Sequence, residues 1–146
     1  MLEEKSCGAI VFLKTGSTIK YLLLDFANRW NFAKGGMESN ETEKQTVVRE
    51  LKEETGIVDA HFMDGFRESL EYCYHRQGLA VHKVVVLYLM EAHGENVKLS
   101  FEHKGYIWLD YRQAREKLPF RNGRDTLDKA HLFLIKKGMA EDGLSS

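Results

Sequence analysis

The feature that most constrains this chain is a glutamate-rich stretch that contains Glu50, Glu53 and Glu54. Its periodicity predicts an α-helix from about residue 40 to residue 55. At about 100° per residue, Glu53 lies roughly −60° and Glu54 roughly +40° from Glu50, so all three carboxylates project from one face. Like charges at this spacing repel each other by a few tenths of a kcal/mol per pair, and something must offset that repulsion.

Two interpretations of this face are open from the helix alone. A solvated surface, with Arg49 and Lys52 as counter-ions, is the common outcome for an isolated glutamate-rich turn. A metal site is the alternative, because hard carboxylate oxygens suit Mg²⁺, or Mn²⁺ in its place, better than zinc. Val47, Val48 and Leu51 fall on an adjoining sector and are expected to pack the helix into the core.

The surrounding sequence predicts one mixed domain. Asn40 is the expected N-cap of the helix, Glu43 completes a capping box, and Gly56 ends the helix. Residues 28–40 are expected to form a loop. Strands are predicted at residues 7–13, 19–26, 61–74, 81–92 and 105–109, and helices at 111–118 and 126–137. These elements predict an α/β fold in the layered (α+β) sense, with a mixed β-sheet sandwiched between helices, over a single domain of residues 1–146 whose last residues, 138–146, form a frayed tail.

The composition excludes several classes of protein. With 21 basic and 22 acidic residues, the net charge of −1 argues against a strongly basic nucleic-acid surface, although a local basic pocket is still open. Cys7 and Cys73 are too few for a disulfide framework or a zinc site, and both are expected to be reduced thiols of the core. The acidic start and short apolar runs predict a cytoplasmic protein with no membrane association and no stable nucleic-acid partner.

The stretch from Gly35 to Ile57 resembles the signature of the Nudix family, G-x5-E-x7-R-E-U-x-E-E-x-G-U, in which U is a bulky aliphatic residue. All nine specified positions match over 23 residues, which makes coincidence negligible. The chain is therefore identified as a member of the Nudix family, and the resemblance implies the Nudix fold.

The resemblance implies roles for the carboxylates. Glu50 and Glu54 match glutamates that ligate divalent metal ions, and Glu53 matches one that ligates an ion or polarises it through water. A main-chain carbonyl near Lys34 or Gly35 matches a further ligand. A nucleotide polyphosphate is a dense anion that glutamates alone would repel. Two or three Mg²⁺ ions would reverse the local charge and acidify the water that attacks phosphorus, with a carboxylate as general base.

The same resemblance implies supporting roles around the helix. Arg49 and Glu41 resemble a pair whose salt bridge braces the loop–helix–loop behind the metal ligands. Gly35 and Gly56 match glycines that permit the tight entry and exit of the chain.

Outside the signature, the chain resembles the diadenosine tetraphosphate hydrolase branch of the family over most of its length. By this resemblance, Lys34 and Lys83 contact phosphate, Tyr72 and Tyr106 flank a base, and Glu102 is an additional metal ligand or general base. Solvated lysines and packed tyrosines are the alternatives that the residue types themselves allow. The matching stretches are residues 30–35, 65–72, 99–109 and 130–134, together with position 83.

The sequence also predicts the surroundings of several single residues. Ala33 stands where that branch has proline, so the expected phosphate loop loses a rigid turn. Trp108 alternates with Tyr106 in one strand and is expected to be the residue of the pair that lies in the core. Arg121 and Arg124, which follow Pro119, are expected on a solvated surface, with guidance of an anionic substrate tail as the alternative.

The first functional hypothesis is Mg²⁺-dependent, asymmetric cleavage of a dinucleoside polyphosphate, such as diadenosine tetraphosphate, into a nucleoside triphosphate and a monophosphate. A nucleoside triphosphate or RNA 5′-end pyrophosphohydrolase is the alternative with the same chemistry. A nucleotide-sensing module without turnover is the alternative from another class. The partner in each case is a nucleotide polyphosphate, and the oligomeric state is left open.

Overall fold

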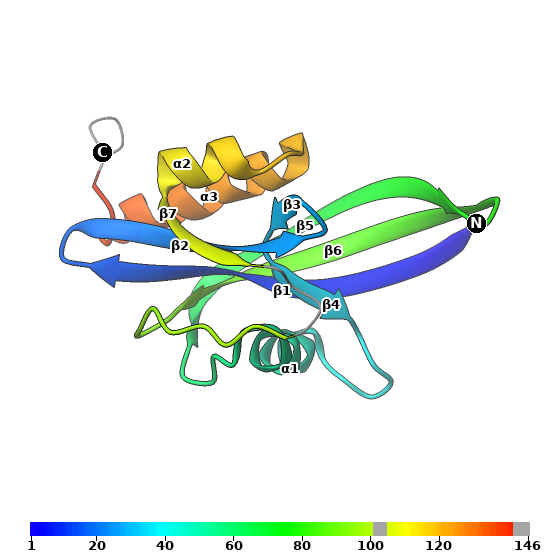
Figure 1. Ribbon diagram of the computed structural model, residues 1–146, viewed down its shortest axis with the longest axis horizontal. Helices are drawn as coiled ribbons and strands as arrows, with labels where there is room; N and C mark the ends of the chain where they lie inside the picture. The colour runs from blue at the N-terminus through cyan, green and yellow to red at the C-terminus, as the bar shows by residue number, and fades with distance from the viewer. Residues whose placement is uncertain (101–104, 142–146) are drawn as a thin grey trace.

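The structure is a computed structural model that describes residues 1–100 and 105–141 of the chain. One seven-stranded mixed sheet lies between helix α1 on one face and helices α2 and α3 on the other (Figure 1), which confirms the predicted architecture. The elements run β1 (Leu2–Thr15), β2 (Thr18–Phe26), β3 (Arg29–Asn31), β4 (Ala33–Gly36), α1 (Glu43–Thr55), β5 (His61–Arg76), β6 (Leu79–Glu91), β7 (Tyr106–Asp110), α2 (Tyr111–Lys117) and α3 (Arg121–Lys136).

The central strand β1 changes its neighbour along one edge. It runs parallel to β6 on the other edge, whereas the remaining strand pairs are antiparallel. Residues 6–9 of β1 pair with β4, and residues 12–15 pair with β2. Gly8 permits the close approach of β4, because a Cβ at this position would lie 2.2 Å from the carbonyl oxygen of Ala33. The change of neighbour brings β4 against α1, and this contact is the basis of the functional site.

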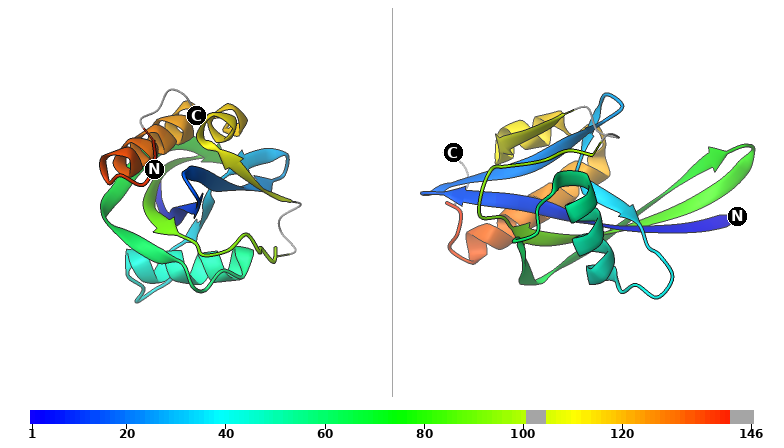
Figure 2. Two further views of the ribbon diagram at one scale, coloured as in Figure 1. Left: turned by 90° about the vertical axis from the view of Figure 1, so that its left-hand side faces the viewer. Right: turned by 60° about the horizontal axis from the view of Figure 1, so that its bottom comes forward.

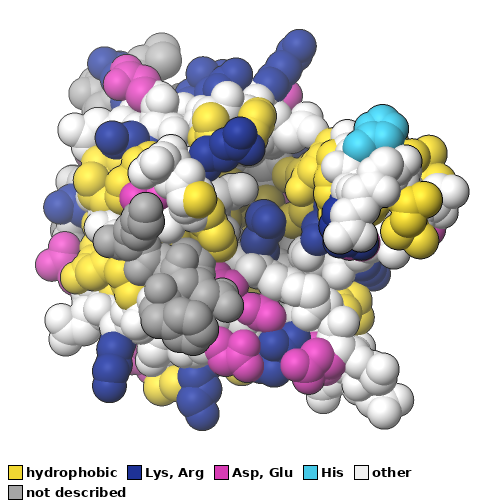
Figure 3. Space-filling model, turned by 45° about the vertical axis from the view of Figure 1, so that its right-hand side comes forward, with side chains coloured by type: hydrophobic (Ala, Val, Ile, Leu, Met, Phe, Trp, Pro, Cys, Tyr) yellow, Lys and Arg dark blue, Asp and Glu magenta, His cyan; other side chains and the backbone are white. Residues whose placement is uncertain are grey.

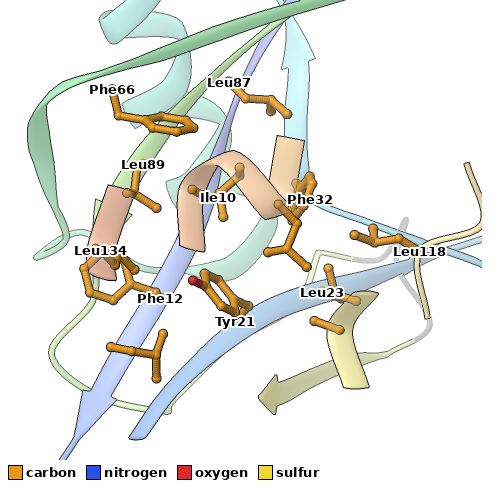
Figure 4. Close-up of a cluster of buried hydrophobic side chains, with 14 of the residues drawn as sticks. Ile10, Phe12, Tyr21, Leu23, Phe32, Phe66, Leu87, Leu89, Leu118 and Leu134 are labelled. Atoms are coloured by element: carbon orange, nitrogen blue, oxygen red, sulfur yellow. The ribbon is translucent and has the colours of Figure 1, made fainter. Parts of the chain in front are cut away.

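Two apolar cores lie on opposite faces of β1, whose residues 6–13 are all buried. Ile10 and Phe12 belong to the core on the face covered by α3 (Figure 4). Cys7 and Val11 belong to the core on the face covered by α1. A strand covered on both faces has a near-continuous apolar sequence, which explains why this run could be recognised in the sequence.

The long hairpin of β5 and β6 turns at Gln77 and Gly78. These two residues have φ values of 52° and 80°, the sign that a two-residue type I′ turn requires at both positions. The hairpin and the N-terminal half of β1 extend beyond the helices as a twisted arm (Figure 2).

Helix α1 begins later than predicted. Its N-cap is Thr42, whose hydroxyl accepts a hydrogen bond from the Gln45 amide at 3.1 Å, while the Gln45 side chain accepts one from the Thr42 amide at 2.9 Å. Asn40 is not the cap, because its φ of 71° is incompatible with the extended conformation that an N-cap adopts. Gly56 ends the helix as predicted, in the left-handed conformation with φ of 74°.

The predicted inner face of α1 is wrong at one position. Val47 and Leu51 are buried against the sheet, but Val48 is 50% exposed. Thr55 and Glu54 occupy the buried sector that Val48 was expected to share. The helix is therefore rotated so that part of its carboxylate face, rather than a further apolar side chain, turns toward the protein.

The structure differs from the prediction in four other segments. The predicted loop at 28–40 contains β3 and β4, whose backbone pairs with β2 and β1. Helix α3 begins at Arg121 rather than at residue 126. Met139 and Ala140 pack on the core instead of fraying, whereas residues 142–146 lie outside the described part of the chain. Cys73 is exposed, because it lies on the projecting arm.

No helix among residues 1–100 and 105–141 combines the length and the apolar character that a membrane span requires.

The different exposure of Leu51 and Val48 on α1 allows a direct test of how the helix packs. Leu51 is 3% exposed, so Leu51→Ala is expected to lower the free energy of unfolding by about 2–5 kcal/mol. Val48→Ala is expected to change the free energy of unfolding by less than about 0.5 kcal/mol, because the exposed Val48 side chain buries little apolar area. Urea denaturation of the two variants would measure both values, and equal losses would contradict the observed rotation of α1.

Candidate active site

The site is formed where α1 crosses β4. The carboxylates of Glu50 and Glu54 lie one helical turn apart and are close enough to interact directly. Gly35 lies directly against Glu50, since a Cβ there would be 2.0 Å from the Cδ atom of Glu50 and 2.2 Å and 2.3 Å from its two oxygens. The Glu50 carboxylate therefore occupies the volume that any other side chain at position 35 would fill, which is the local reason for a glycine.

Glu54 is a buried carboxyl group with an incomplete set of partners. It is 5% exposed, and its Oε1 atom has no hydrogen-bond partner in the structure. Burial, followed by the neighbouring Glu50 carboxylate, raises the pKa of Glu54 well above its ordinary value. A hydrogen bond from the main chain at Lys34 and the positive charge of its side chain act in the opposite direction. A dry, partly unpaired carboxyl group of this kind needs a proton or a cation.

Arg49 holds the two sides of the site together. Its Nε atom donates to Glu41 Oε2 at 2.6 Å, Nη1 donates to Glu50 Oε1 at 2.8 Å, and Nη2 donates to the Gly36 carbonyl at 2.9 Å. The ion pair of Arg49 with Glu41 that was expected is thus present, and it lowers the pKa of Glu41 to about 2. The guanidinium fixes one oxygen of Glu50 while linking α1 to β4 and to the loop before the helix.

Glu53 is separated from this pair. Its side chain is 58% exposed and lies 3.3 Å from Arg49 Nη1, on the solvent side of the helix. The structure thus brings Glu50 and Glu54 together and leaves Glu53 at the rim. The sequence placed the three carboxylates on one helix face but did not determine which of them turn toward β4. That face spans about 100°, and β4 covers only part of it.

The paired carboxylates fit a hard divalent cation. Among the residues that the structure describes, no three His, Cys, Asp or Glu side chains form a group that could hold a metal ion. Mg²⁺ does not require such a group, since one or two carboxylates together with water and substrate oxygens hold it in many enzymes. The unpaired buried oxygen of Glu54 and the Glu50 carboxylate packed against Gly35 agree with that donor set.

A cleft of 480 Å³ lies on the other side of β4. Lys34 extends from β4 into it, Tyr72 lines it from β5, and Phe120 and Arg121 line it from the start of α3. In Figure 3 the hollow contains basic side chains, hydrophobic side chains flank it, and acidic side chains lie below it. Burial, then the nearby charge of Lys83, lowers the pKa of the Lys34 ammonium, and the Glu54 carboxylate opposes this shift. Lys34 therefore connects the cleft with the carboxylate pair.

The remaining residues expected in the site are placed differently from one another. Lys83 is opposite Tyr72 in the β5–β6 register, so both lie on the cleft face of the hairpin, and Lys83 Nζ is 3.7 Å from Glu4. Tyr106 is exposed on β7 and does not line the cleft. Glu102 lies outside the residues that the structure describes.

The structure also shows the surroundings of Trp108 and Ala33. Trp108 packs against the core under α1, as predicted, and donates from Nε1 to the Glu95 carbonyl at 2.9 Å. Ala33 is buried as the first residue of β4 and pairs with Ala9, so sheet pairing holds this segment where a proline ring was expected to stiffen it.

Sequence reasoning missed the far wall of the cleft. Arg29 lies over the Phe120 ring at 5.6 Å from the ring centroid, and Asn31 lines the cleft between them and β4. Arg121 was expected on a solvated surface, and it is strongly exposed, but it also lines the mouth of this cleft. The one available signal was Pro119, which marks the turn that brings these residues together.

Comparisons with known proteins agree with this geometry. The family model described as the NUDIX domain matches residues 6–130. The chain is 34% identical over 143 residues to the asymmetrical bis(5′-nucleosyl)-tetraphosphatase of Mus musculus, covering 89% of this chain and 95% of that protein. It is 26% identical to the dihydroneopterin triphosphate diphosphatase of Haemophilus influenzae, covering 94% of each. Among solved structures, a binary complex of the C. elegans Ap4A hydrolase superimposes with a TM-score of 0.81 at 27% identity, covering 91% of this chain and 98% of that one.

The chain therefore belongs to the Nudix family and is a Nudix hydrolase. Among the proteins that it resembles are asymmetrical bis(5′-nucleosyl)-tetraphosphatases, which match it over 89% of its length.

The two neighbouring glycines of β4 provide a matched test of the site. Gly35→Ala is expected to displace the Glu50 carboxylate and to weaken divalent-cation binding by about 10- to 100-fold. Gly36→Ala is the control, because nothing lies within 4 Å of a Cβ at that position. Titration with Mn²⁺ would compare them, and equal affinities would contradict the contact between β4 and α1.

The buried carboxyl group predicts an unusual pH dependence of stability without metal. Because the pKa of Glu54 is raised above its ordinary value of 4.5, ionisation costs more in the folded chain than in the unfolded chain. The contribution of Glu54 to the free energy of unfolding is therefore fully present at pH values below that ordinary value. It is lost as the pH rises toward the pKa that Glu54 has in the folded chain. Glu54→Gln is therefore expected to be more stable than the wild type at pH 8 in EDTA, with the difference shrinking at pH 5. Urea denaturation at both pH values would measure it, and a difference independent of pH would exclude Glu54 as the cause.

Proposed function

We propose that this Nudix hydrolase cleaves dinucleoside polyphosphates such as diadenosine tetraphosphate, asymmetrically and with Mg²⁺, into a nucleoside triphosphate and a nucleoside monophosphate. The observation that carries the proposal is the position of Lys34, between a cleft with aromatic walls and the carboxylate pair. The cleft suits a nucleoside, and the carboxylates suit the cations of a polyphosphate. The named activity of the mouse relative supports the same substrate class.

Each part of the site has a role in this reaction. Tyr72 offers an exposed aromatic ring to a base, while Lys34 and Lys83 present positive charge to phosphate oxygens on the same face. Glu50 and Glu54 would hold Mg²⁺, which neutralises phosphate charge and acidifies water when bound. Mn²⁺ can substitute, because it accepts the same oxygen ligands.

The proton of the attacking water passes to a carboxylate. Glu53, at the solvent-facing rim, can receive that proton without losing contact with bulk water. Glu54 is the second candidate base, and the proposed role of Glu102 as ligand or base stays a prediction. Arg49 keeps Glu50 oriented during the reaction by its bond at 2.8 Å.

The alternative substrate is a nucleoside triphosphate or an RNA 5′ end. The named activity of the Haemophilus influenzae relative favours a triphosphate. A long RNA track receives less support, because Arg76 on the arm is bound to Glu4 at 2.5 Å and Lys83 lies near the same carboxylate. A sensor without turnover receives less support still, since binding alone gives no reason to bury an unpaired Glu54 oxygen. The cytoplasmic location stays a prediction, and the oligomeric state is open.

A panel of substrates with product analysis tests this proposal. With Mg²⁺, diadenosine tetraphosphate is expected to yield ATP and AMP in equal amounts, at a higher kcat/KM than ATP or a triphosphorylated RNA. Glu54→Gln is expected to lower kcat by orders of magnitude while the far-ultraviolet circular dichroism stays unchanged. Two molecules of ADP would contradict asymmetric cleavage, and a preference for the single triphosphates would assign the chain to another substrate class.

A further inference from the structure

The first residue of α1 is the centre of a second ionic network on the carboxylate helix. Arg67 donates to Glu43 from Nε at 2.9 Å and from Nη2 at 2.8 Å, so the pair is bidentate. Tyr88 donates its hydroxyl to the same carboxylate at 2.7 Å, and Lys5 Nζ lies 2.8 Å from it. One carboxylate at the start of the helix is thereby bound to side chains of β5, β6 and β1.

This network lies outside the residues that define the family signature, in which position 43 is unspecified. Its bonds are charge-assisted, and the fork geometry of Arg67 restricts rotation as well as distance. The side chain of Glu43 is 19% exposed, so solvent screening is weaker here than for a pair on the open surface. Arg67 and Lys5 are about half exposed, so the direction of the forked bond, more than its strength, fixes the start of α1 on the sheet.

The geometry of a helix connects this anchor with the carboxylate pair. Seven residues at about 100° each place Glu50 roughly −20° from Glu43, and eleven residues place Glu54 roughly +20° from it. The three carboxylates thus form one stripe along α1, with Glu50 about 10 Å and Glu54 about 16 Å from the anchor at about 1.5 Å per residue. A rotation or tilt of the helix at Glu43 is transmitted directly to both.

The site has little tolerance for such a movement. The Glu50 carboxylate lies in the space that a Cβ of Gly35 would occupy, so β4 and α1 are already in close contact. Cation ligands must be held within about 0.5 Å of their working positions. Val47 and Leu51 fix the helix by apolar packing, which resists separation from the sheet more than it resists small rotations.

We propose that Glu43 and Arg67 are positioning residues for the divalent-cation site, and that their bidentate pair sets the rotation and tilt at which α1 presents Glu50 and Glu54 to β4. This inference rests on the proposed function only in requiring that these carboxylates bind a cation.

A purely electrostatic role makes the opposite prediction for one of the two residues. Arg67→Gln removes a positive charge from the region of α1, so electrostatics alone would strengthen the binding of a divalent cation. Loss of positioning weakens it. Glu43→Gln cannot separate the two explanations by sign, because it removes a negative charge and the anchor together.

The chain contains a matched control on the opposite face of the sheet. Asp128 accepts bonds from Arg115 Nε at 2.9 Å and Nη2 at 3.2 Å, and from the Tyr111 hydroxyl at 2.5 Å. It has the same kinds of partner as Glu43, but these bonds join α3 to α2, on the face of the sheet opposite α1 (Figure 1). Asp128→Asn therefore reproduces the loss of an ionic network without disturbing the carboxylate helix.

The experiment is a titration of the substrate-free protein with Mn²⁺, followed by electron paramagnetic resonance, with Tm recorded for each variant. Glu43→Gln and Arg67→Gln are each expected to weaken Mn²⁺ binding by about 10- to 100-fold. Arg67→Lys keeps the charge but loses the fork, so an intermediate affinity is expected. Asp128→Asn is expected to lower Tm and leave the Mn²⁺ affinity unchanged.

Two results would overturn the inference. Arg67→Gln could bind Mn²⁺ as tightly as the wild type or more tightly, which would leave only electrostatics. Asp128→Asn could weaken binding as much as Glu43→Gln, which would make the effect one of general stability. A wild-type protein that binds no Mn²⁺ would instead remove the cation site itself, and the proposed function with it. Normal binding combined with a different substrate preference would change the proposed substrate and leave the positioning role intact.

Discussion

The structure depends on the close placement of two carboxylates in a region that water reaches poorly. Glu50 and Glu54 repel each other, and the buried Oε1 atom of Glu54 has no hydrogen-bond partner. A folded chain tolerates this arrangement only when a proton or a cation neutralises the pair. The contacts around the pair hold the two carboxylates in place.

Several independent contacts share this task. Gly8 lets β4 pair closely with β1, and Gly35 then leaves room for the Glu50 carboxylate. Arg49 ties α1 to β4, while Thr42 and Gly56 cap the two ends of the helix. These contacts act on different parts of one rigid element. Their combined effect is to limit the rotation, the tilt and the length of α1, which are the three quantities that set the position of a side chain on a helix.

The cleft on the other side of β4 gives the carboxylate pair its chemical context. Lys34 extends into the cleft from the strand that contacts α1, so the cleft lies directly beside the carboxylate pair. The cleft and the carboxylate pair are adjacent because β1 changes its neighbour from β4 to β2, which leaves β4 in the sheet between them.

The sequence by itself determined the features that arise from local periodicity and from the signature: the mixed sheet between helices, the carboxylate helix and its end at Gly56, and the pairing of Arg49 with Glu41. Only the tertiary structure decided that Val48 faces solvent, that Glu53 lies apart from Glu50 and Glu54, and that Arg29 and Phe120 form one wall of a cleft. It also joined Glu43 to Arg67, which lie 24 residues apart. The physical reason is that periodicity states which side chains share a face, whereas the packing of distant strands decides which part of that face is covered and by what.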